Sequence, residues 1–84
     1  MKSIKSQLLI ILTCATMELH EKYNEIMKLL RTTKAVNHVQ MRLYNQMGAT
    51  KESMSTIIYD LQKLYGITDV ELRTPIVAQN NTDV

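Results

Sequence analysis

The feature that most constrains this chain is a first half that contains no helix breaker. Residues 1–47 hold neither glycine nor proline. Apolar residues recur along this half in steps of three and four, the spacing of one face of an α-helix: Ile4, Leu8, Ile11, Ala15, Leu19, Tyr23, Met27 and Leu30. The pattern predicts one long first helix over about residues 3–31, interrupted, if at all, near Thr13–Thr16.

Capping residues then mark a second helix. The segment "RTTKAVN" supplies threonines and an asparagine, which favour helix ends over helix interiors. We expect the second helix over 34–47, ended by Gly48 in the left-handed conformation that closes helices at low cost. Its apolar positions predict a buried face made of Val36, Val39, Leu43 and Met47.

A third helix is predicted over residues 50–65. Thr50 is a suitable N-cap, and Glu52 places an anion in the first turn, where the helix dipole favours it. Gly66 ends this helix. Its predicted buried positions are Met54, Ile57, Ile58, Leu61 and Leu64.

The end of the chain predicts one more short element. Thr68 to Glu71, "TDVE", has the form of a capping box, so a brief fourth helix follows before Pro75. Residues 75–84 have no apolar periodicity and are predicted to be a flexible tail. The expected fold is therefore all-α: a single helical domain over 1–74 with three helices, the first of them long, and a short fourth.

Charge, cysteine content and the absence of known motifs limit the functions that this chain can have. Ten Lys and Arg against eight Asp and Glu give a formal net charge of +2, which permits a nucleic-acid partner without demanding one. The single cysteine, Cys14, cannot form an internal disulfide, so we expect a reducing, cytoplasmic setting. We expect no enzyme, cofactor or metal, because there is no glycine-rich phosphate loop, zinc ligand set or catalytic triad context.

The amino terminus resembles a targeting signal only in part. The uninterrupted apolar run Leu8–Leu12 is shorter than the roughly 7–15 residues of a signal-peptide core. No stretch approaches the ~20 apolar residues of a membrane span. We therefore expect no membrane association.

The stretch around Gly48 has the spacing of a helix-turn-helix corner. Such a corner needs a glycine turn with apolar residues at fixed distances on both sides, and here Leu43, Met47, Met54 and Ile57 occupy them. The other positions of the third helix form a polar outer face. Hydroxyl and amine groups there suit contacts with base edges and phosphates in a major groove.

This stretch resembles the carboxy-terminal DNA-binding domain of LuxR/GerE-type regulators. The family corner reads roughly "LGISxxTVxxHLxxIxxKLGV", and residues 47–67 read "MGATKESMSTIIYDLQKLYGI" with the same glycine separation. Upstream, "LHEKYNEIMKLLR" is similar to the family's "LTxREREVLxLL" helix. The resemblance covers about residues 19–73 and implies a transcription regulator that binds duplex DNA.

The predicted DNA contacts follow from the polar outer face of the third helix. Thr50 and Lys51 would hold phosphates at the helix start. Ser55, Thr56 and Tyr59 would face bases or the opposite backbone, and Lys63 lies in the last turn.

A second hypothesis needs no DNA. A first helix longer than a small core requires predicts a partner on either hypothesis: a second copy of the chain, which would make the DNA-binding protein a dimer, or another helical protein. The protein would then be a non-enzymatic adaptor, secretion-type chaperone or anti-regulator. The predicted interface consists of Ile4, Leu8, Ile11, Ala15 and Leu19.

Overall fold

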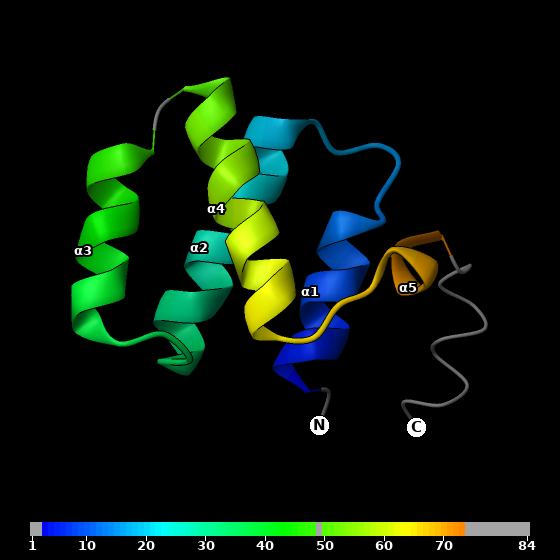
Figure 1. The fold of residues 1–84 in the computed structure, drawn as a ribbon, viewed down its shortest axis with the longest axis horizontal. Helices are drawn as coiled ribbons and strands as arrows, with labels where there is room; N and C mark the ends of the chain where they lie inside the picture. The colour runs from blue at the N-terminus through cyan, green and yellow to red at the C-terminus, as the bar shows by residue number, and fades with distance from the viewer. Residues whose placement is uncertain (1–2, 49, 74–84) are drawn as a thin grey trace.

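The computed structural model describes residues 3–48 and 50–73, and every regular element in these ranges is a helix. The helices are α1 (Ile4–Leu12), α2 (Leu19–Thr33), α3 (His38–Met47), α4 (Lys51–Leu64) and α5 (Asp69–Arg73). Figure 1 shows α3 at one edge of the bundle and α1 with α5 at the other. The all-α fold class is confirmed. The predicted tail at 75–84 lies outside the described residues.

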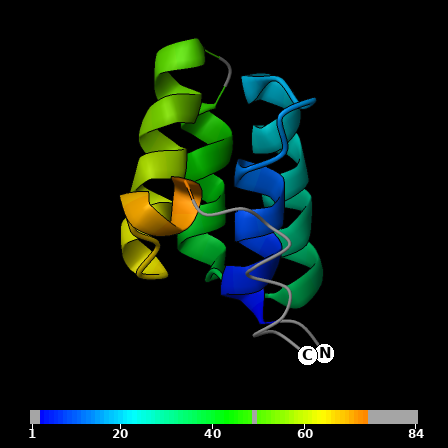
Figure 2. The same cartoon turned by 90° about the vertical axis from the view of Figure 1, so that its right-hand side faces the viewer.

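The long first helix is wrong as one continuous rod, and the break lies where the sequence allowed it. α1 stops at Leu12, where the Thr13 hydroxyl donates to the Leu9 carbonyl at 2.6 Å. The Lys22 Nζ atom of α2 donates to the Leu12 carbonyl at 2.9 Å, which satisfies one of the carbonyls left open at the helix end. The chain therefore turns back, and α1 and α2 pack side by side and antiparallel (Figures 1 and 2).

The second predicted helix begins four residues later than expected, and it turns a different side toward the core. Lys34 takes a left-handed conformation with φ of 53° and ends α2, so α3 begins only at His38. The Asn37 side chain caps α3 by accepting from the Gln40 amide at 2.9 Å. α3 turns Tyr44 into the core, with 8% of it exposed.

The predicted buried face of this helix is therefore wrong for three of its four residues. Val36 is buried in the connection before α3, but Val39, Leu43 and Met47 are 68%, 50% and 47% exposed. The physical reason is competition between two apolar faces of α3. Tyr44 buries a larger side chain than any of these three, and its carbonyl also accepts a buried hydrogen bond from the Tyr23 hydroxyl at 3.1 Å.

α4 agrees closely with the prediction. Thr50 caps it by accepting from the Ser53 amide at 3.1 Å. Ile57, Ile58 and Leu61 are buried, as expected, although Leu64 is 57% exposed. After the helix, Gly66 adopts φ of +67°, which is why this position favours glycine.

Gly48 has a different role from the predicted one. Its φ is −95°, so it is not in the left-handed region. A Cβ atom there would lie 2.8 Å from the Tyr44 carbonyl oxygen and would overlap the Tyr23 hydroxyl. Glycine is needed at this turn because Tyr23 of α2 packs directly against its backbone.

The core lies between α2 and α4, which make the most extensive helix contact, with α1 closing one side. Its most deeply buried side chains are Leu8, Ile26, Leu30, Ile57 and Leu61. Figure 2 shows α4 and α5 on one side of the bundle and α1 with α2 on the other.

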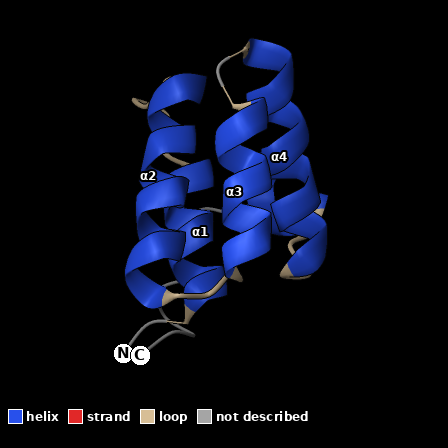
Figure 3. Cartoon of the chain, turned by 90° about the vertical axis from the view of Figure 1, so that its left-hand side faces the viewer, coloured by secondary structure: helices blue, strands red, loops and turns tan. Residues whose placement is uncertain are grey.

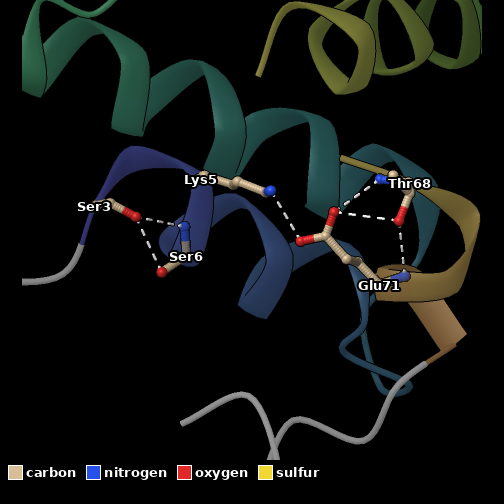
Figure 4. A network of polar contacts seen from close by, with 5 residues as sticks. All are labelled: Ser3, Lys5, Ser6, Thr68 and Glu71. Carbon is tan, nitrogen blue, oxygen red and sulfur yellow. Dashed lines mark hydrogen bonds and ion pairs between the residues drawn. The ribbon is translucent and has the colours of Figure 1, made fainter. Parts of the chain in front are cut away.

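The capping box predicted at Thr68 is confirmed, and it also fastens α5 to α1. The Thr68 amide donates to the Glu71 carboxylate at 3.1 Å, and the Glu71 amide donates to the Thr68 hydroxyl at 3.2 Å. The same carboxylate forms an ion pair with Lys5 at 2.9 Å (Figure 4). The bond from Lys5 and the Thr68 amide lower the pKa of Glu71. This contribution to stability is thus present above the ordinary carboxylate pKa and is lost as the pH falls through the lowered value.

Candidate interaction surfaces

The predicted DNA contacts all lie on or beside one exposed face of α4. Six residues are solvent-exposed along this helix and its cap: Thr50, Lys51, Ser55, Thr56, Tyr59 and Lys63. The Lys63 ammonium lies 4.5 Å from the centre of the Tyr59 ring, within cation–π range. The Thr56 hydroxyl already donates to the Glu52 carbonyl at 2.9 Å. The exposed carboxylates of Glu52 and Asp60 lie on the same helix, so α4 carries a mixed charge.

The corner before α4 is a hairpin. α3 and α4 lie side by side and run antiparallel (Figures 1 and 3), whereas the two helices of a helix-turn-helix cross at about 90–120°. α4 therefore lies along the bundle, with α3 beside it over its length.

The partner interface predicted on the first helix faces the chain's own core. Leu8 is 1% exposed, and Ile4, Ile11 and Leu19 are partly buried against the same core. Ala15 is exposed but lies in the connection between α1 and α2. The premise of the prediction, an apolar stripe longer than the core needs, is thus wrong: the stripe folds in two and is used internally.

An apolar stripe is instead exposed on α3, where the sequence predicted a core face. Val39, Leu43 and Met47 follow one another at intervals of four positions, so they lie on one face of this helix. We name these three residues the α3 stripe. The helical spacing detected the stripe correctly, but spacing alone does not tell a core face from a binding face.

A groove between the end of α2 and the start of α3 is a second feature that the sequence did not predict. It has a volume of about 580 Å³ and is lined mainly by apolar and cationic side chains, among them Leu30, Arg31 and Lys34. Its residues come from two helices and their connection, so no local motif identifies it.

The polar clusters of the described residues resemble ordinary surface groups. At the start of α2, Glu18, His20 and Glu21 bring possible ligand atoms within 4.8 Å of one another, but all three are exposed.

Hydrogen bonds with Thr16 lower the pKa of the Cys14 thiol, which lies half-buried in the α1–α2 connection. Cys14 is not one of the residues that form the hydrophobic core cluster or pack against it.

Buried tyrosines have structural roles. Burial raises the pKa of Tyr23 and of Tyr44. The Tyr23 hydroxyl donates to the Tyr44 carbonyl, and this bond joins α2 to α3.

Among the described residues, no helix has the length and apolar character needed to cross a membrane. Comparison with protein-family models, curated proteins and solved structures gives no match.

Proposed function

We propose that this protein is a non-enzymatic helical module that binds a helix of another protein along the α3 stripe. The single observation that carries the proposal is the exposure of Val39, Leu43 and Met47 on a helix at the edge of the bundle. A contiguous exposed apolar patch on a small domain often marks a protein interaction site.

The dimensions suit a partner helix. The stripe runs from Val39 to Met47, which is eight steps of ~1.5 Å, or about 12 Å. Apolar anchors at this spacing are the usual basis of helix recognition. Burying one valine from the stripe would contribute roughly 1.5–3 kcal/mol.

Charge favours a different protein over a second copy as the partner. Residues 38–47 contain the cation Arg42 and no acidic residue. Pairing α3 with itself would bring like charges together, which disfavours association. A partner that carries acidic residues beside its apolar face avoids this repulsion.

The test compares two valines of equal exposure. Val39 on α3 is 68% exposed, and Val70 on α5, at the opposite edge, is 66% exposed. We expect Val39→Asp to weaken partner binding at least tenfold, because it removes an anchor and places a carboxylate in the contact, and we expect Val70→Asp to have little effect. The measurement is affinity of the purified partner, identified by crosslinking from position 43, for each variant. Equal affinity of the wild type and Val39→Asp would refute the proposal.

Duplex DNA binding through α4 is the second candidate, supported by the common exposure of the six predicted contacts. On this hypothesis Lys51 and Lys63 approach phosphates, and Ser55 and Tyr59 face the bases. Two phosphate contacts would give a modest dependence of log affinity on log salt, with a slope of about −2.

We expect the double variant Lys51→Glu/Thr56→Ala to abolish such binding and leave the fold intact, since both side chains are exposed. Fluorescence anisotropy with a random-sequence duplex at low salt measures it. Lys28→Glu, an exposed position on α2, is the charge-matched control for Lys51. Absence of duplex binding by the wild type at low salt would eliminate this candidate.

A further inference from the structure

The groove between α2 and α3 has an apolar floor. Leu30 is fully buried at its base, Val36 is 7% exposed, and Met41 packs against the core from α3. Its lining residues come from the end of α2, from the connection that follows and from α3. At about 580 Å³ its volume is within the range of sites that hold ligands or side chains of a bound peptide.

The rim of this groove is cationic. Arg31 and Lys34 line it, and no carboxylate is among its lining residues in the described part of the chain. The Arg31 Nη2 atom donates to the Asn45 Oδ1 atom at 3.2 Å, so the guanidinium extends across from α2 to α3. A neighbouring depression continues along α3 past Arg42, again without an acidic lining residue in the described chain.

Lys34 occupies a backbone position that favours glycine. Its φ is 53°, and it is the non-glycine residue with positive φ among those described. Its amide donates to the Arg31 carbonyl, and the next amide, of Ala35, donates to the Leu30 carbonyl, the pattern that normally selects glycine. A lysine here strains the turn and at the same time keeps a cation at the rim.

We propose that this groove binds an acidic, amphipathic segment of the protein partner. Its carboxylates would pair with Arg31 and Lys34, and an apolar side chain beside them would pack on Met41, which is partly exposed at the groove. The inference rests on the proposed protein-binding function and adds the chemistry of the partner. A nucleic-acid backbone would satisfy the cations but would leave the partly exposed Met41 side chain in water.

The experiment selects peptides from a random twelve-residue library displayed on phage, with the full chain as the target. We expect the selected peptides to carry more Asp and Glu than Lys and Arg, next to large apolar residues. Replacing their Asp and Glu with Asn and Gln should weaken binding at least tenfold.

Variants of the chain locate the site. Arg31→Gln should weaken peptide binding at least fivefold. Lys34→Gly should weaken it similarly while the melting temperature stays equal or rises, because glycine fits φ of 53° without strain. Lys28→Gln removes a charge from α2 at an exposed position that does not line the groove, and it should leave binding unchanged.

The outcomes separate this inference from the proposed function. Binding that depends on Val39 but not on Arg31 or Lys34 overturns the groove and leaves the α3 stripe standing. Dependence on Lys34 and Arg31 but not on Val39 supports the groove and counts against the stripe. Selection of peptides without an acidic excess, or of no peptide at all, overturns the inference.

Discussion

Replacing Leu8 with Asp is expected to unfold the chain. Leu8 is 1% exposed and lies in the core with Ile26 and Leu30. The substitution removes roughly 2–5 kcal/mol of apolar packing and buries a carboxylate, which costs several kcal/mol more. A chain of this length has a total stability on the order of 4–12 kcal/mol. Far-UV circular dichroism should therefore find little cooperative melting in this variant.

This result would differ from the one expected of a surface interface. If Leu8 lay on an exposed dimer stripe, as the first-helix hypothesis predicts, Leu8→Asp would stay folded and lose only its partner. Leu8→Met, which conserves volume, is the control and should cost less than about 1.5 kcal/mol. A melting curve of Leu8→Asp close to that of the wild type would contradict the burial of this residue.

Gly48→Ala is expected to destabilise the fold by about 2–4 kcal/mol. The added Cβ atom would lie 2.8 Å from the Tyr44 carbonyl oxygen and 2.9 Å from the Tyr23 Cζ atom, and it would displace the Tyr23 hydroxyl. The variant therefore combines overpacking with the loss of a buried hydrogen bond. For a domain of this size the melting temperature should fall by roughly 4–8 °C for each kcal/mol lost.

A double-mutant cycle assigns this cost to Tyr23. In the Tyr23→Phe background the hydroxyl is absent, so Gly48→Ala should cost at least about 1 kcal/mol less than in the wild type. Gly66→Ala is the comparison for backbone strain. Position 66 has φ of +67° and no atom within 4 Å of an added Cβ, so its cost should be about 1 kcal/mol. Close packing of Tyr23 against Gly48 would be contradicted if Gly48→Ala cost no more than Gly66→Ala, or if its cost were the same with and without the Tyr23 hydroxyl.

Local signals predicted the second half of the fold well. Thr50 and Gly66 mark both ends of α4, and the apolar positions between them include Ile57, Ile58 and Leu61, all of which face the core. The capping box of α5 was also recognisable, because Thr68 and Glu71 are three residues apart and bond each other directly. Such signals act within one turn of helix and are therefore visible in sequence.

The errors arose where a distant contact decides between local alternatives. The break after α1 is closed by Lys22, ten residues beyond the carbonyl it binds. The rotation of α3 depends on the bond between Tyr23 and Tyr44, which are 21 residues apart. Apolar spacing identified the face of α3 that contains Leu43, but it could not show that Tyr44 would occupy the core instead.

One candidate site could be predicted from local spacing, and the other depends on contacts between distant parts of the chain. The polar face of α4 follows from helical spacing alone, so the exposure of Ser55 and Tyr59 could be predicted. The groove depends on the bond from Arg31 of α2 to Asn45 of α3, which are far apart in the sequence. The left-handed turn at position 34 is occupied by lysine, so the sequence lacks the glycine that usually marks such a turn. Sequence reasoning has no signal for either feature.

The orientation of α3 is the central claim, and thermal unfolding of two neighbouring variants tests it most directly. Leu43 is 50% exposed and Tyr44 is 8% exposed. With α3 oriented as described, Leu43→Ala changes stability by no more than about 0.5–1 kcal/mol, whereas Tyr44→Ala costs about 3 kcal/mol. The reverse order, with Leu43→Ala the more damaging, would place the α3 stripe in the core and contradict the account.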